Sequence, residues 1–389
     1  MRLLQDFSLS AVVAGFVTVL VGFTSSAVIV FQAAQALGAT PAQIASWMWA
    51  LGLAMGVTCI GLSLRYRVPV VTAWSTPGAA MLVTSVAGVT MPEAIGAFIL
   101  CGLLIVLAGA SGWFERAMAR IPVAIASAML AGVLLRFGMA AFVSLGTQLA
   151  LVGAMLATYL LLRRLWPRYA IVAVLLVGVA VAAIQGQLHL GGVRWQLAAP
   201  VFTLPALSWQ AVLSVALPLF LVTMASQNVP GVAVLKASGY HPPISPIIAT
   251  TGVVATLLAP FGAFALNLAA ITAAICMGPE AHEDPAKRYT AAIAAGVFYL
   301  IVGLFGVTVA ALFAAFPKEL VLALAGLALI NTIGNGLAAA VRDEAQREPA
   351  LITFLVTASG VTLFGIGSAF WGLVAGALAF AVLGWRRGK

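Results

Sequence analysis

Charged residues are scarce in this chain of 389 residues. Lysine, arginine, aspartate and glutamate together make up 7% of the sequence, whereas a soluble domain carries about 25%. Hydrophobic residues account for 63%, and the mean hydropathy is +1.14. Apolar runs long enough to cross a bilayer recur along the whole length, and no polar segment between them is long enough to fold alone. The sequence therefore indicates one integral membrane unit, which excludes an appended soluble catalytic domain.

Cysteine and histidine are equally rare, with three of each. Cys59, Cys101 and Cys276 fall in apolar segments and are odd in number, which favours packing over a disulfide framework. The histidines are scattered in loops, and no aspartate or glutamate lies clearly inside an apolar segment. A membrane enzyme would need such groups clustered within the membrane. We therefore expect no enzymatic activity, no metal and no cofactor.

The apolar segments predict an all-α integral membrane protein with fourteen spans. The third and tenth spans are irregular, and several others are short. The predicted spans cover residues 8–31, 42–64, 68–87, 92–112, 122–144, 147–166, 168–188, 209–231, 243–259, 260–278, 288–313, 317–340, 349–366 and 367–385.

Basic residues gather on one side of this predicted topology. With the N-terminus in the cytoplasm, every lysine and arginine except Arg136, Arg194 and Lys318 falls at a cytoplasmic end. Because positive charge is retained in the cytoplasm during insertion, we expect both termini there. The net charge of +9 is then an insertion signal and does not predict nucleic-acid binding. Arg136 lies deep in the fifth span, where a structural or gating role is favoured, although it could also reach the surface or pair with Glu93.

The two halves of the chain resemble each other weakly but in a constant order. "FSLSAVVAG" (7–15) aligns with "LSWQAVLSV" (207–215). Further along, Gly102, Gly109 and Pro122 align with Gly296, Gly303 and Pro317. Seven spans in each half is an odd number, so the second half must enter the membrane from the opposite side. The sequence predicts two inverted repeats, residues 1–188 and 189–389.

The interrupted spans occupy equivalent places in the two repeats. "VTAWSTPGAAML" (71–82) and "FGAFALNLAAITAA" (261–274) each read as a short extended segment followed by a half-helix. A simple kink is the alternative for either break. Paired half-helices entering from opposite sides would point their N-termini at each other, and such ends attract anions. The two breaks therefore predict an anion site near the membrane midplane.

Three stretches carry a resemblance to a known family. "TAWSTPGAAML", "VTMASQNVPGVAVLKASGY" (222–240) and "APFGAFALNLAAITAAICMG" (259–278) resemble the benzoate:proton symporter family, BenE, and more distantly the uracil, xanthine and sulfate permeases. The resemblance implies a core domain at about 8–112 and 209–313. It also implies a gate domain at about 122–188 and 317–385. Substrate would sit between the third and tenth spans, whose extended segments pair as strands.

The candidate site residues lie around the two breaks and at the eighth span. Nucleobase permeases carry carboxylates in the eighth and tenth spans, where this chain has amides, which fits an anionic substrate. The predicted substrate-binding residues are Gln227, Asn228, Asn267, Ser75, Thr76, Thr24, Ser25, Phe23, Trp74 and Phe264. Each polar member has an alternative role in helix capping or helix packing, and each aromatic member an alternative role in the core.

The sequence as a whole predicts a secondary active transporter of the bacterial inner membrane. It would import benzoate or a related aromatic carboxylate with a proton, and its partners would be that substrate, the proton and the lipid bilayer. The sequence leaves open whether the protein forms a homodimer. The rival interpretations are a permease of the same fold for a nucleobase or inorganic anion, and an anion channel whose broken spans form a filter.

Overall fold

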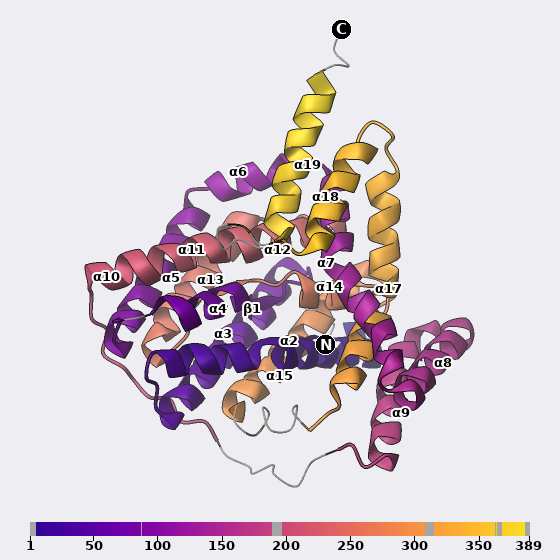
Figure 1. Ribbon diagram of the computed structural model, residues 1–389, viewed down its shortest axis with the longest axis horizontal. Coiled ribbons are helices and arrows are strands. Elements are labelled where there is room, and N and C mark those ends of the chain that lie inside the picture. The colour runs from indigo at the N-terminus through magenta and orange to yellow at the C-terminus, as the bar shows by residue number, and fades with distance from the viewer. Residues whose placement is uncertain are drawn as a thin grey trace.

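The computed structural model describes residues 5–86, 88–188, 197–306, 308, 315–361, 363 and 368–385. Within these ranges the chain is mostly helical, as predicted, and its helices and two short strands are joined by irregular segments (Figure 1). The first half contains α2 (Leu9–Ala36), α3 (Pro41–Tyr66), β1 (Thr72–Trp74), α4 (Thr76–Ser85), α5 (Met91–Ala110), α6 (Trp113–Ala119), α7 (Val123–Val143), α8 (Leu149–Leu165) and α9 (Ala170–Ile184). The second half contains α10 (Trp209–Ala211), α11 (Leu217–Thr223), α12 (Val229–Ala237), α13 (Ile244–Leu258), β2 (Leu266–Leu268), α14 (Ile271–Met277), α15 (Tyr289–Leu304), α17 (Lys318–Val341), α18 (Arg347–Ser359) and α19 (Ser368–Trp385).

Among the described residues, seven helices are long and apolar enough to cross a membrane. They cover Pro41–Tyr66, Met91–Ala110, Val123–Gly146, Trp209–Ala237, Ile244–Phe261, Pro285–Leu304 and Lys318–Val341. The remaining predicted spans hold shorter or partly described helices. The short helix α6, between the fourth and fifth predicted spans, was not predicted from the sequence.

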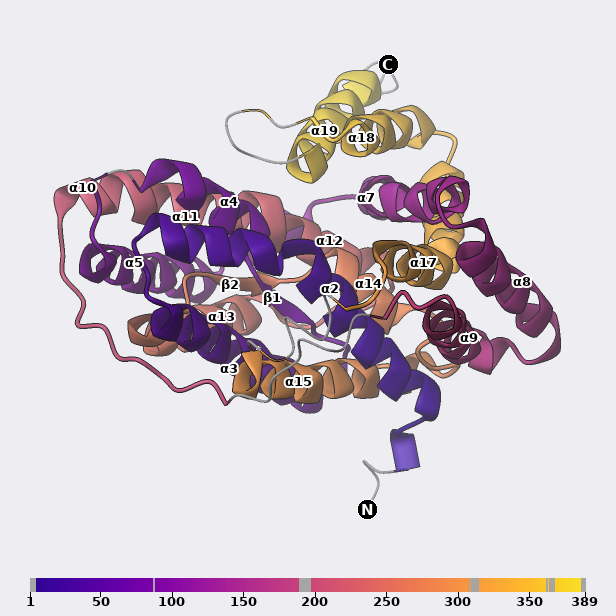
Figure 2. The same cartoon turned by 60° about the horizontal axis from the view of Figure 1, so that its bottom comes forward.

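The helices gather into two groups. Figure 2 shows α7, α8, α9 and α17 on one side of the molecule with α18 and α19 above them, and α2 to α5 with α10 to α15 on the other side. Near the middle of the molecule α12 packs on α7 across the boundary between the two groups, and β2 and α14 pack on α12.

The two strands pair antiparallel in the middle of the group that contains α2 to α5 and α10 to α15. Thr72 stands opposite Leu268, Ala73 opposite Asn267 and Trp74 opposite Leu266. Two further bonds extend the ladder, one from the Ser75 N–H to the Ala265 carbonyl at 3.2 Å and one from the Ala269 N–H to the Val71 carbonyl at 2.9 Å. The pairing satisfies backbone groups that would otherwise be orphaned where no helix is present. The extended segments of the third and tenth spans are therefore observed as predicted.

Glycines allow two helix pairs to pack closely. On α3, Gly52 and Gly56 lie against Gly303 and Gly296 of α15, and a Cβ on Gly52 would come within 2.5 Å of the Gly303 Cα. On the equivalent pair, Gly102 of α5 lies against Gly252 of α13. Small residues let membrane helices approach until their backbones touch. The helix α5 thus packs on α13 in the way that α15 packs on α3.

The helix formed by residues 209–237 is distorted at two places. Its hydrogen bonds reach back five residues at Val212–Ala216 and again at Met224–Asn228. Each wide turn stands just before a proline, Pro218 or Pro230, which has no N–H to donate. The Val229 N–H instead reaches the Met224 carbonyl. Such π turns are frequent at functional sites, and the second one carries Gln227.

Candidate functional site

A cavity of about 330 Å³ lies at the meeting point of the two broken segments. This volume is within the usual range for small-molecule sites. Its wall is drawn from both halves of the chain and consists of Val21, Gly22, Ser26, Met55, Ala73, Trp74, Thr76, Pro77, Phe137, Gln227, Ala269, Ala270, Ile271, Thr272 and Tyr299. Of these described lining residues, none is an aspartate, glutamate, lysine or arginine.

Two helix N-termini open onto this cavity. Thr76 and Pro77 begin α4, and Ile271 and Thr272 begin α14. The Ser75 side chain caps α4 by accepting from the Gly78 N–H at 3.2 Å, while Ala270 precedes α14 without a side-chain cap. First-turn N–H groups lack partners inside their own helix and carry partial positive charge. Both helix starts therefore favour a negatively charged ligand.

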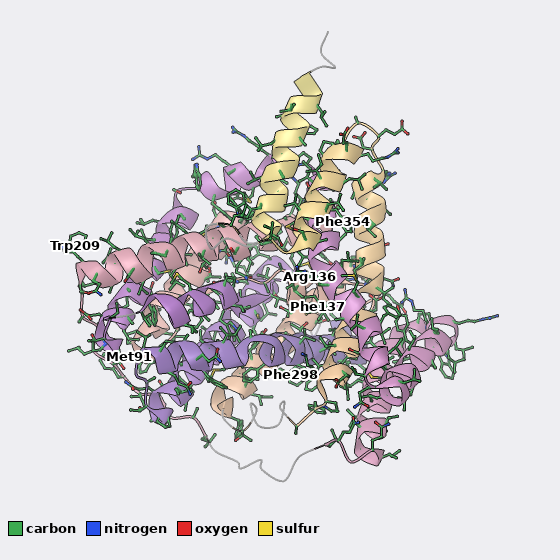
Figure 3. All side chains as sticks on the ribbon, viewed as in Figure 1. Met91, Arg136, Phe137, Trp209, Phe298 and Phe354 are labelled. Atoms are coloured by element: carbon green, nitrogen blue, oxygen red, sulfur yellow. The ribbon has the colours of Figure 1, made fainter. Side chains whose placement is uncertain are left out.

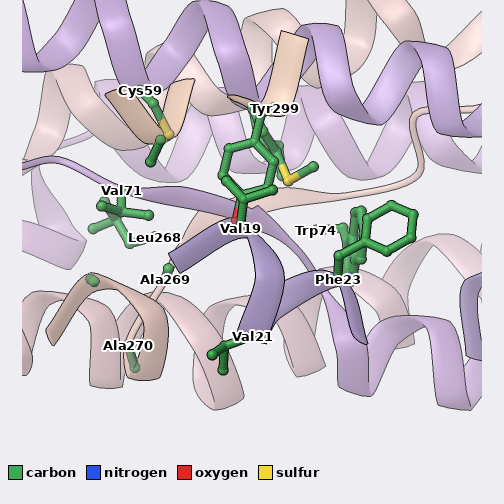
Figure 4. Packing of buried hydrophobic residues seen from close by; sticks show 14 of the residues in the cluster. Val19, Val21, Phe23, Cys59, Val71, Trp74, Leu268, Ala269, Ala270 and Tyr299 are labelled. Atoms are coloured by element: carbon green, nitrogen blue, oxygen red, sulfur yellow. The ribbon is translucent and has the colours of Figure 1, made fainter. Parts of the chain in front are cut away.

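An aromatic wall closes one side of the cavity. Trp74 meets Phe23 edge to face, with ring centroids 5.8 Å apart, and its indole N–H donates to the Ser26 Oγ at 3.0 Å. Figure 4 shows Trp74 beside Phe23, with the Tyr299 ring nearby. Gly22 faces Tyr299, because a Cβ there would be 3.4 Å from the Tyr299 hydroxyl. The site thus combines an apolar aromatic surface with a few polar groups, as a pocket for an aromatic ligand requires.

Gln227 lies where this cavity meets a second one. The second cavity has a volume of about 500 Å³ and shares Pro77, Phe137, Gln227, Ala270 and Ile271 with the first. Its other wall is formed by α7, α17, α18 and α19, so it opens between the two groups of helices. Gln227 is half-buried. An amide at this junction can donate to a ligand carboxylate without adding a competing negative charge.

Arg136 lines the second cavity from α7. Its guanidinium donates to the Ser359 carbonyl at 2.8 Å and to the Ala358 carbonyl at 3.3 Å, so it holds the C-terminal end of α18. A Cβ on Gly360 would overlap the guanidinium, so only glycine allows this contact. Figure 3 shows Arg136 and Phe137 side by side on α7, near the end of α18. A cation at a helix C-terminus is electrostatically favourable.

This placement decides between the alternatives for Arg136. Pairing with Glu93 is wrong, because the Glu93 carboxylate accepts from the Thr90 N–H at 2.8 Å at the start of α5. The side chain is exposed to the cavity, and its charge faces the space next to Gln227. Arg136 is therefore the cation that an anion in the second cavity would approach.

Several predicted site residues do not line either cavity. Asn228 is fully buried, and its Oδ1 accepts from the Leu268 N–H at 2.9 Å, so it anchors β2. Asn267 is also fully buried and donates to the Leu268 carbonyl, and since Ala270 precedes α14, Asn267 does not cap that helix. Phe264 packs against Trp47 and Phe98, with ring centroids 5.9 and 6.1 Å away.

The other predicted residues divide as follows. Thr76, Trp74 and Gln227 line the cavity. Phe23 supports Trp74 from behind, and the Ser75 side chain is used in capping α4. The side chains of Thr24 and Ser25 lie outside the described part of the structure.

Sequence reasoning missed several cavity residues that come from intact helices, and the largest of them lie on α3, α7 and α15. Phe137 belongs to α7, Met55 to α3 and Tyr299 to α15. None stands next to a break in its own helix. The one signal available was the position of Phe137 directly after Arg136, the single basic residue deep in a predicted span.

Apolar helices around a central cavity, with two interrupted segments meeting at its wall, define a membrane transport protein of the multi-pass class. The chain belongs to the benzoate membrane transport protein family, BenE, whose sequence model matches residues 5–382.

Two curated relatives cover almost the whole chain. It is 53% identical over 370 residues to the inner membrane protein YdcO of Escherichia coli (strain K12), with 95% of each chain covered. It is 44% identical over 379 residues to the benzoate membrane transport protein of Acinetobacter baylyi, with 97% of this chain and 96% of the relative covered. The fold is similar to the overall structure of SLC26A9, with a TM-score of 0.50 at 11% identity over 99% of this chain and 66% of that longer chain.

Proposed function

We propose that this protein is a secondary active transporter that imports benzoate or a related aromatic carboxylate together with a proton. The observation that carries the proposal is the smaller cavity, where an aromatic wall stands beside two helix N-termini and no carboxylate is present among the described lining residues. An aromatic ring would pack on Trp74, and its carboxylate would lie toward the helix starts and the Gln227 amide. The A. baylyi relative, named for benzoate transport, adds support for the substrate class.

The transporter would be built as two inverted repeats of seven spans, residues 1–188 and 189–389. The packing of α5 on α13 and of α15 on α3 supports this, because equivalent glycines make equivalent close contacts in the two pairs. The pairing of β1 with β2 also supports the repeats, because the two strands stand at equivalent places in the two halves. Repeats inserted in opposite senses can exchange shapes, which gives a carrier two access states around one site.

The moving parts would be a core domain, about 8–112 and 209–313, and a gate domain, about 122–188 and 317–385. The second cavity lies between them and touches Gln227 on the core and Arg136 on the gate. We infer that the core carries substrate past the gate, and that Arg136 attracts the carboxylate along this boundary. No covalent step is involved.

Exchange of substrate across the membrane tests the proposal directly. A carrier reorients one site for each molecule, so purified protein in liposomes should take up labelled benzoate faster when unlabelled benzoate is trapped inside. Uptake should saturate, and benzoate should compete better than uracil, sulfate or bicarbonate. Steady unitary currents without exchange would show a channel instead. Preference for uracil or an inorganic anion would assign a different substrate to the same fold.

Membrane orientation gives a separate prediction. Because the basic residues gather at one set of helix ends, we expect both termini and the loop around Glu283 to face the cytoplasm, in the bacterial inner membrane. In a Glu283→Cys variant, a membrane-impermeant maleimide should label the protein in inside-out vesicles and not in intact cells. The native cysteines Cys59, Cys101 and Cys276 are buried and should give little background. Labelling from the outside of intact cells would reverse the orientation.

A further inference from the structure

A carboxyl group is buried where the two groups of helices touch, away from both large cavities. Glu280 follows α14 in the loop before α15, and it is 8% exposed. Acidic residues are almost never buried to this degree unless they are paired. The sequence placed this residue in a loop or at a span edge, which did not indicate its burial.

The partners of Glu280 come from the other group of helices. Arg163 of α8 lies 3.2 Å from the Glu280 Oε1, and the Asn331 amide of α17 donates to the same oxygen. The second carboxyl oxygen, Oε2, is buried and has no hydrogen-bond partner in the part of the chain that the structure describes. Burying an ionised carboxylate costs free energy when one of its oxygens has neither water nor a hydrogen-bond donor. A proton on that oxygen removes the charge.

The loop that holds Glu280 is fixed to its own group of helices. Arg288, at the start of α15, donates to the Met277 carbonyl at 2.9 Å and to the His282 carbonyl at 2.8 Å. Glu280 therefore stays with α14 and α15, while Arg163 and Asn331 stay with α8 and α17. A movement that separates the two groups would therefore take Glu280 away from Arg163 and Asn331 and would open its carboxyl group to water.

Among the residues that the structure describes, few charges surround Glu280. Tyr159 of α8 and Arg288 are the other titratable or charged groups there that act on it, besides Arg163. The faces of α2, α9, α14 and α17 that share its small cavity carry uncharged residues, which are Ser10, Val13, Ala14, Ile171, Val172, Ile275 and Ala328. Burial raises the pKa of the Glu280 carboxyl, and its own backbone N–H, Arg163, Asn331 and Arg288 offset this only in part.

We propose that Glu280 is the residue that carries the coupled proton, held on the buried carboxyl while the core packs against the gate and released to water when the two separate. This inference rests on the proposed proton-coupled transport. The direction of proton movement follows from linkage. The packed state raises the pKa of the Glu280 carboxyl and so binds the proton more tightly, and separation returns this pKa toward its ordinary value. The step moves one proton between water and a carboxylate and changes no covalent bond of the substrate.

The test separates exchange from proton-driven accumulation in liposomes. Glu280→Gln keeps an uncharged side chain of the same shape. Because Glu280 does not line either large cavity, this variant should still exchange labelled for unlabelled benzoate. It should lose the accumulation of benzoate against its gradient that an imposed pH difference drives in the wild type. Glu280→Asp, which keeps a titrating group, should recover part of that accumulation.

Two matched variants separate a proton site from a structural ion pair. Arg163→Gln removes the positive partner and leaves the carboxyl, so accumulation should persist with its pH profile displaced upward. Glu283→Gln changes an exposed carboxylate in the same loop and should behave as wild type. If Glu280→Gln does not fold, the pH profile of accumulation by Arg163→Gln decides the question. A profile that is the same as in the wild type overturns the proposal.

Two other results would also overturn it. One is wild-type accumulation by Glu280→Gln under the pH difference, and the other is equal loss of exchange and accumulation in that variant. If the wild-type protein itself shows no benzoate exchange, the proposed function fails and not this assignment.

Discussion

Gln227→Glu should bind benzoate weakly at neutral pH and regain part of its affinity as the pH falls. Gln227 lines both cavities, so the introduced carboxylate would share a poorly screened space with the carboxylate of the substrate. Two like charges in such a site repel each other strongly until one of them takes a proton. Binding should therefore improve toward acid, whereas the wild type has no carboxylate among the described residues of the smaller cavity to titrate.

Gln227→Ala is the matched control for this result. It removes the amide donor without adding a titrating group, so its affinity should be low at every pH. One lost hydrogen bond to a charged group is worth about 1.5–3 kcal/mol, or roughly 10- to 150-fold in affinity. Calorimetry at pH 7.5 and pH 5.5 on the three proteins would measure both effects. Wild-type affinity of Gln227→Glu at neutral pH would show that Gln227 does not touch the carboxylate.

Gly52→Val should destabilise the protein and weaken substrate binding together. A Cβ at Gly52 would lie 2.5 Å from the Gly303 Cα, 2.6 Å from the Gly303 nitrogen and 2.7 Å from the Tyr299 carbonyl oxygen. These are backbone atoms, so α3 and α15 must move apart, and overpacking of this kind costs about 1–3 kcal/mol or more. The same two helices supply Met55 and Tyr299 to the cavity wall. Separation of the helices therefore enlarges the site.

Gly61→Val tests whether the effect comes from the helix contact. Gly61 stands on the same helix, and no heavy atom outside its own helix backbone lies within 4 Å of a Cβ built there. The melting temperature of the Gly61→Val variant in detergent and its benzoate affinity should match those of the wild type. Both quantities should fall in the Gly52→Val variant. Equal behaviour of the two variants would mean that α3 and α15 do not need to touch at Gly52.

The broken segments were predictable because their residue types act locally. Pro77 cannot donate a backbone hydrogen bond and suits a helix start, Ser75 is a good cap, and the β-branched residues before them favour extended backbone. The same rules hold wherever the segment lies in the protein. The strand, the cap and the half-helix at Thr72–Ser85 were accordingly found as predicted.

Side-chain direction around the breaks was not predictable in the same way. Asn228 and Gln227 are adjacent amides, yet one is used inside the protein to hold β2 and the other reaches the cavity. The direction of each depends on the wide turn before Pro230, which shifts the helix face by a fraction of a turn. Phe264 was likewise assigned by its nearness in sequence, but the tertiary contact with Trp47 and Phe98 decides its position.

Residues from distant helices could not be recognised because they obey no local pattern. Phe137 and Tyr299 are ordinary aromatics within apolar helices, and only the assembled fold brings them to the cavity. Glu280 is a comparable case, since it pairs with Arg163, which lies far away in the chain.

The ladder between β1 and β2 has a consequence for inhibitors. Because Ser75 and Ala269 are bonded across the ladder to Ala265 and Val71, the starts of α4 and α14 are fastened at a fixed separation. We expect the part of the pocket formed by the two strands and the two helix starts to move as one rigid unit, with the same shape at either face of the membrane, while Phe137 stays with the gate. A competitive aromatic acid should then have one intrinsic affinity from both sides. Any asymmetry in its potency would come from access through the boundary with the gate.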